Sequence, residues 1–89
     1  MRIFKYIIQK PDDEVMIEMQ KGAKILCVKV QSGIVCIWAI VDPDSPIKPR
    51  EIQIRGTGHL MKGNEGEYIG TVMLSSGALV FHFFISPED

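Results

Sequence analysis

Residues 24–41 read KILCVKVQ-SG-IVCIWAIV, and this stretch decides the fold class. Two runs rich in β-branched residues flank a two-residue turn that contains glycine, which is typical of a β-hairpin. With Ser32-Gly33 as the turn, Cys27 lies opposite Trp38, and Cys36 lies on a diagonal from Cys27, so we expect two free thiols. Because side chains alternate along a strand, one face of this hairpin is predicted to be wholly apolar. Its members are Leu26, Val28, Val30, Val35, Ile37, Ala39 and Val41.

A second hairpin repeats this plan near the C-terminus. The run 68–75 leads into Ser76-Gly77 and returns as residues 78–85, with Thr71 opposite His82. When the two Ser-Gly turns are superposed, His82 takes the position of Trp38. Packing the two ribbons face to face is the economical way to bury their apolar sides.

The other segments are shorter. Residues 2–9 are predicted to form a strand, and residues 50–55 alternate with Ile52 and Ile54 pointing inward. Residues 11–22 fit a helix that begins with Pro and acids and ends at glycine, or a strand with alternating apolar residues; we favour the strand. The prediction is one all-β domain over residues 1–89, a small antiparallel β-sandwich or partly open barrel of about six to seven strands.

Composition excludes several classes of protein. The net charge of −1 argues against nucleic acid as a partner, because nucleic-acid binders usually carry a basic excess. The most apolar run, residues 34–41, is far shorter than the roughly 20 residues of a membrane helix. The first residues do not form a signal segment, since Lys5 interrupts them. We therefore expect a soluble cytoplasmic protein that does not bind a membrane.

The segment Arg55-Gly56-Thr57-Gly58-His59 concentrates side chains that a folding core does not need. Two glycines let a ligand approach the backbone, and an arginine with a histidine can hold a phosphate or carboxylate. Lys48, Arg50 and Lys62 add positive charge nearby. The alternative is that the glycines form a tight corner and that His59 caps a backbone group. The segment predicts either an anion-binding turn or a structural corner.

Other chemistry finds little support in the sequence. Cys27, Cys36, His59 and His82 lack the spacing of metal ligands, so we expect no metal and no cofactor. No convincing nucleophile or acid–base set can be assembled, so we predict no catalytic residues and a protein that is not an enzyme.

Both predicted hairpins carry apolar residues on both faces, although one face suffices for a two-layer core. The second face must be covered by other strands, by another copy of the chain or by a partner. We expect a homo-oligomer, a dimer in the simplest case, in which Trp38 either anchors the interface or completes the core. The candidate interface residues are Trp38, Ile34, Ile40 and Phe84.

The segments at residues 21–26, 38–43, 56–59 and 77–82 resemble those of a family of small hypothetical proteins from tailed bacteriophages. This resemblance implies a phage or prophage origin and action in the cytoplasm of the bacterial host. The family is a domain of unknown function, so it assigns no role to any residue. The prediction is a non-enzymatic phage accessory protein that binds and inhibits a host protein, such as a defence component, or that assembles with itself. The alternative is a protein that binds a small anionic ligand or nucleotide, or a minor enzyme, at the Arg55–His59 turn.

Overall fold

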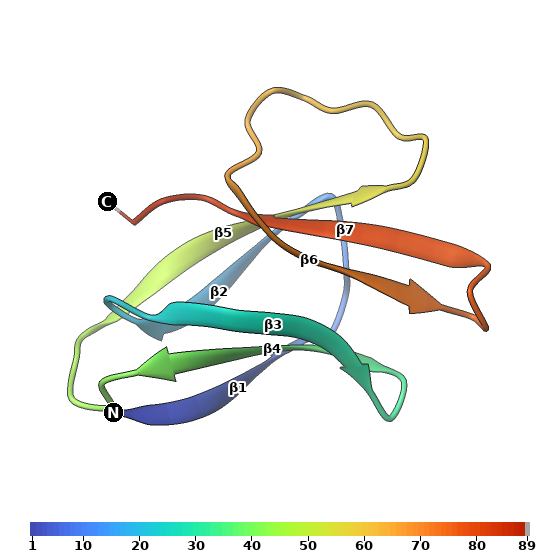
Figure 1. Cartoon of the computed structure of the whole chain (residues 1–89). Coiled ribbons are helices and arrows are strands. Elements are labelled where there is room, and N and C mark those ends of the chain that lie inside the picture. The colour runs from blue at the N-terminus through green and yellow to red at the C-terminus, as the bar shows by residue number, and fades with distance from the viewer. Residues whose placement is uncertain (89) are drawn as a thin grey trace.

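The computed structural model describes residues 1–88, and these residues form seven strands and no helix. All pairings are antiparallel, and the strands make two sheets that face each other (Figure 1). The strands are β1 (Arg2–Ile8), β2 (Glu14–Gln20), β3 (Lys24–Gln31), β4 (Ile34–Val41), β5 (Ile47–Gly56), β6 (Glu67–Leu74) and β7 (Leu79–Ile85).

The three-stranded sheet has the order β1-β4-β3, and the four-stranded sheet has the order β2-β5-β7-β6. The predicted fold class is therefore confirmed as a small open sandwich. Residues 14–20 form a strand, as favoured over the helix, because Val15, Ile17 and Met19 alternate toward the core. In the described chain no helix is long and apolar enough to cross a membrane.

The first hairpin has the predicted register, with Cys27 paired to Trp38 across β3 and β4. Ser32 and Gly33 both have positive φ, 52° and 80°, as a two-residue hairpin turn requires. The prediction for Leu26 was wrong, since a bulge between Ile25 and Cys27 shifts the alternation. Leu26 is 46% exposed, and Ile25 packs against the core in its place.

The second hairpin also has the predicted register, with Thr71 opposite His82. Its strands end at Leu74 and Leu79, so four residues form the turn. A bulge between Tyr68 and Gly70 turns Ile69 toward the core, so Ile69 does not belong to an outward apolar face of this hairpin. Each hairpin thus carries one bulge in its first strand, and each bulged strand, β3 or β6, is one of the two edge strands of its sheet.

The core lies between the sheets and consists of aliphatic residues with one large aromatic, Phe83. Ile37 at the centre of β4 and Ile52 on β5 are fully buried. Trp38 is adjacent to Ile37 in sequence and therefore points to the opposite, outer face of its sheet. Its partly exposed ring is not a member of the buried core cluster. Both cysteines are free thiols, as expected.

Candidate functional site

Arg55 is the most highly connected side chain of the predicted turn, and its hydrogen bonds are internal. It is only 4% exposed, on the outer side of β5 beneath the loop that joins β5 to β6. Its Nε donates to Glu65 at 2.8 Å, and its Nη1 donates to Glu14 at 2.7 Å. Further hydrogen bonds from Nη1 and Nη2 reach the carbonyl of Asp13 and the side-chain oxygen of Asn64. The guanidinium therefore fastens this loop to the strands beneath it.

Glu65 is the buried partner in this network. Its side chain is 6% exposed, and its carboxylate also accepts hydrogen bonds from the backbone N–H groups of Lys62 and Gly63. The Lys62 N–H, the residue's own N–H and the Arg55 guanidinium together lower the pKa of Glu65 to about 2, against the opposing effect of burial. Hydrogen bonds from Lys62 and Arg55 also lower the pKa of Glu14. Both carboxylates are therefore charged at neutral pH, and the loop is held by charge-assisted hydrogen bonds.

Acidification should weaken the fold through Glu65. Its pKa is about 2 in the folded chain, against an ordinary value of 4.5, so the unfolded chain binds more protons between these values. The free energy of unfolding should therefore fall as the pH drops from about 4.5 to 2, as measured by urea titration at each pH. The Glu65→Gln variant should show a shallower fall, while Glu67→Gln, at an exposed glutamate on β6, should keep the slope of the parent. Parallel curves for the parent and Glu65→Gln would contradict this assignment.

A second buried polar side chain, Gln53, holds the end of the same loop. Gln53 is fully buried, and its Oε1 accepts a hydrogen bond from the N–H of Gly66 at 2.9 Å. Its Nε2 donates to Glu51 and to the hydroxyl of Ser86. Gln53 and Arg55 alternate with inward-pointing isoleucines, so both lie on the outer side of β5. The loop covers this side of the strand and buries the two polar side chains.

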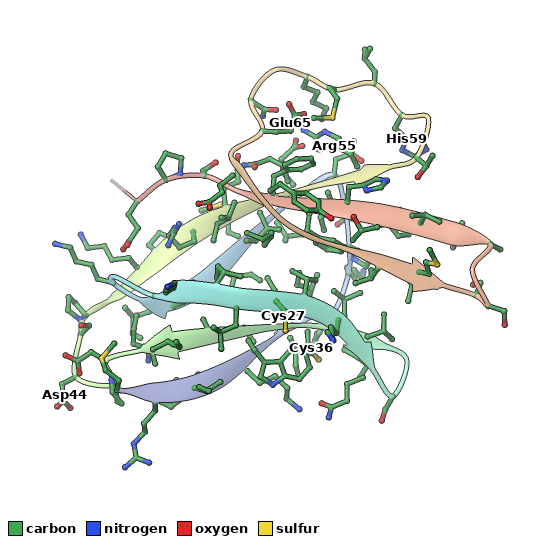
Figure 2. All side chains as sticks on the ribbon, viewed as in Figure 1. Cys27, Cys36, Asp44, Arg55, His59 and Glu65 are labelled. Carbon is green, nitrogen blue, oxygen red and sulfur yellow. The ribbon has the colours of Figure 1, made fainter. Side chains whose placement is uncertain are left out.

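His59 lies apart from Arg55, at the other end of the loop (Figure 2). Its exposed ring covers Gly56, because a Cβ added to Gly56 would come within 2.8 Å of the ring. Thr57 hydrogen-bonds through Oγ1 to Nε2 of His82 at 2.8 Å, and the other ring nitrogen of His82 meets the Thr71 hydroxyl. The positive φ of Gly58, 87°, is the conformation for which glycine is favoured. The turn thus contains a buried arginine that holds the loop and an exposed histidine. The two side chains do not point toward a common position for a ligand.

The outer face of the three-stranded sheet carries several exposed apolar side chains outside the core. The pairings of β1 and β4 place Ile3 opposite Ile40 and Ile7 opposite Cys36 on this face. Ile3, Ile7 and Ile34 are 62%, 48% and 44% exposed. Trp38 lies at the centre of this face, between Lys5 and Cys27. No strand of the described chain covers it, because the two sheets pack through their other faces.

The charges on the three-stranded sheet are all of one sign. Its strands carry Arg2, Lys5, Lys24 and Lys29 and no Asp or Glu. Four of the ten basic residues lie here, so the remaining six basic and eleven acidic residues give the rest of the chain a net charge of −5. Lys5 and Lys29 stand on either side of β4, and Lys5 donates to Gln31 across the strand. This face therefore combines exposed isoleucines and a tryptophan with a positive frame.

The predicted interface residues do not form one surface. Ile34, Trp38 and Ile40 share the outer face of the three-stranded sheet. Phe84 instead lies on the outer face of the four-stranded sheet and packs edge-on against Tyr68, with ring centroids 5.7 Å apart. The structure thus brings three of the four residues together.

Sequence reasoning did not single out the partners of Arg55. Glu14, Asn64 and Glu65 carry no such signal, because nothing local distinguishes a buried carboxylate in a loop from a solvated one. For Arg50 the sequence indicated a positive charge and no structural role. Its spacing from Ile52 and Ile54 was a usable signal, since alternation places all three on the inner face of β5.

Comparisons with known proteins point to one family. A family model described as Domain of unknown function (DUF7352) matches residues 1–89. No curated protein and no solved structure matches the chain.

Proposed function

Because the chain belongs to the DUF7352 family, a domain of unknown function, we propose its function from its own surface. It is a non-enzymatic binding module that docks an acidic protein partner on the outer face of the three-stranded sheet. The observation that supports this most directly is the uncovered row of Ile3, Ile7 and Ile34 around Trp38, framed by lysines. Large exposed apolar patches rimmed by polar residues are typical of protein-interaction sites.

The chemistry of the face favours a protein over a nucleic acid. Isoleucine side chains neither stack on bases nor read their edges, and Trp38 is the one aromatic side chain on this face. The net charge of −1 also disfavours a long polyanion, which would meet the acidic remainder of the chain as well as the lysines. A compact acidic segment can contact Lys5 and Lys29 while its apolar side chains pack on Trp38.

The setting we propose is the cytoplasm of a phage-infected bacterium, with a host protein as the partner. The resemblance to small phage proteins supports this setting, and inhibition of a defence component is one form that such binding takes. The Arg55–His59 turn is the weaker candidate for a function, since the Arg55 guanidinium is committed to two carboxylates.

The test compares two charge-reversal variants of equal net charge. Lys5→Glu with Lys29→Glu reverses the frame of the face, and Lys10→Glu with Lys21→Glu reverses two exposed lysines outside it. We expect tagged parent chain to capture a bacterial protein that the second variant also retains and that the first loses. Binding of the purified partner should change the fluorescence of Trp38, the single tryptophan of the chain.

Equal capture by both variants would contradict the docking face. So would a partner that binds without affecting the Trp38 emission or that is basic in its contact region.

The alternative that we propose is that a second copy of the chain occupies this face. A twofold pairing through this face would set Lys5 and Lys29 of one copy against those of the other, which lowers its stability. Sedimentation at micromolar concentration separates the two cases. A dimer that the Lys5→Glu, Lys29→Glu variant strengthens or weakens would assign the face to self-assembly, whereas a monomer leaves it to the acidic partner.

A further inference from the structure

Arg50 is a buried charged residue that neither the loop network nor the docking face uses. It is 8% exposed and lies on the inner face of β5, in line with Ile52 and Ile54. Its Nε and Nη2 both donate to the carbonyl oxygen of Ser86, at 3.3 and 2.9 Å. One edge of the guanidinium is thereby fixed in place by the backbone.

The other edge of this guanidinium is available. Among the described residues, Nη1 of Arg50 makes no hydrogen bond, and its one ion pair is a long contact of 3.8 Å with Glu88. An arginine binds an oxyanion best through two parallel N–H groups. The Nη1–Nη2 edge offers these two groups, because Nη2 has a second N–H beside the one that it gives to Ser86.

Arg50 also lines a groove between the two sheets. The groove has a volume of about 380 Å³ and runs between β3 and β6, at the places where the two bulges lie. A volume of this size is in the range of small-molecule sites. Besides Arg50 its lining includes Lys24, Ile25, Leu26, Tyr68 and Ile69.

We propose that this groove binds a small oxyanion that carries an apolar group, such as a carboxylate or a phosphate monoester with an aliphatic or aromatic tail. The oxyanion pairs with the free edge of Arg50 and with Lys24. The tail packs on Ile25, Leu26 and Ile69. This site is separate from the docking face, because it lies between the sheets rather than on the outer face.

The chain supplies an acid of its own beside this site. Both carboxylate oxygens of Glu88 accept a hydrogen bond from the N–H of Gly22, at 3.0 Å each, while the carboxylate stands near Arg50. Glu88 does not line the groove itself, and its negative charge lies beside Arg50, which does line it. A bound anion therefore competes with Glu88 for Arg50, and removing the charge of Glu88 strengthens binding. Glu67 does line the groove and adds a second negative charge.

The experiment uses hexanoate as the probe, with hexanol as its neutral match and inorganic phosphate as the anion without a tail. Amide shifts of the isotopically labelled full chain, read by NMR, should locate hexanoate at Ile25, Leu26 and Ile69 and at the Arg50 Nε–H. A dissociation constant of about 1 mM is expected for a ligand of this size. Hexanol and phosphate should bind about tenfold more weakly or not at all.

Three variants complete the test. Glu88→Gln should tighten hexanoate binding about threefold, and Lys24→Gln should weaken it about threefold. Arg50→Gln should weaken it at least tenfold in folded protein. Lys10→Gln, at an exposed lysine outside both the groove and the docking face, is the control and should leave binding unchanged.

Several results would overturn the site. They are equal shifts with hexanoate and hexanol, unchanged binding in folded Arg50→Gln, and no effect of Glu88→Gln. If Arg50→Gln does not fold because Ser86 loses its anchor, Lys24→Gln and Glu88→Gln still decide the question.

Discussion

Replacing Arg55 with methionine should lower the free energy of unfolding by about 3 to 5 kcal/mol, as measured by urea denaturation. The variant removes the hydrogen bonds that Arg55 makes to Glu65, Asn64 and the carbonyl of Asp13, and it leaves the Glu65 carboxylate buried without its cation. Glu14, 2.7 Å from Nη1 in the parent, loses one of its two cationic partners and retains Lys62. A loss of this size is a large part of the stability of a domain of 89 residues.

Two further variants identify the cause of this loss. Arg2→Met removes an exposed arginine from β1 and should change stability by less than about 0.5 kcal/mol. Adding Glu65→Gln to Arg55→Met should restore part of the loss, because the unpaired buried charge is then absent. Additive effects of the two substitutions would show that Arg55 and Glu65 do not act as a pair.

Replacing Gly66 with alanine should destabilise the chain by about 3 kcal/mol, through a steric clash rather than through charge. A Cβ at this position would lie 1.9 Å from the carbonyl oxygen of Ile85 and 2.7 Å from the Cα of Ser86. Both are backbone atoms. Ile85 pairs with β6 and Ser86 directly follows Ile85, so neither atom can move away without disturbing the sheet. The N–H of Gly66 would leave Gln53, and the loop would separate from the sheet. Urea denaturation and amide hydrogen exchange of the loop measure both effects.

Gly56→Ala is the matched control for this prediction. Its Cβ also meets a close neighbour, at 2.8 Å, but that neighbour is the exposed ring of His59, which can rotate away. We expect a cost below about 1 kcal/mol. If the two alanine variants were equally stable, close backbone packing would not be the reason for glycine at position 66.

The sequence predicted the strands well because their signals are local. The turn at Ser32-Gly33 fixes the register of its hairpin, and the alternation in residues 14–20 selects strand over helix. The bulges at Leu26 and Ile69 were missed, since an extra residue in a run of apolar side chains changes no pattern that the sequence displays.

The candidate site was harder to predict because its chemistry depends on distant contacts. Arg55 has its partners at residues 14 and 65, and no spacing rule connects a strand residue to a carboxylate across a loop. The sequence indicated that positions 53 and 55 share a polar face, and it could not show that a loop closes over that face. Ile34, Trp38 and Ile40 could be placed on one face from the sequence because they alternate along a single strand, whereas Ile3 and Ile7 join them from β1 through a pairing that no local pattern displays.

The two bulged strands have a consequence for how a partner can be recognised. Proteins often bind an extended peptide by adding it as a further strand to the border of a sheet, which requires a regular row of free backbone groups. The irregularities at Leu26 in β3 and at Ile69 in β6 interrupt that row at one of the two edges of each sheet. The same interruptions hinder copies of the chain from pairing edge to edge through β3 or β6. Recognition on this side of the molecule therefore depends on side chains, and a partner should be selected by its composition rather than by its readiness to form a strand.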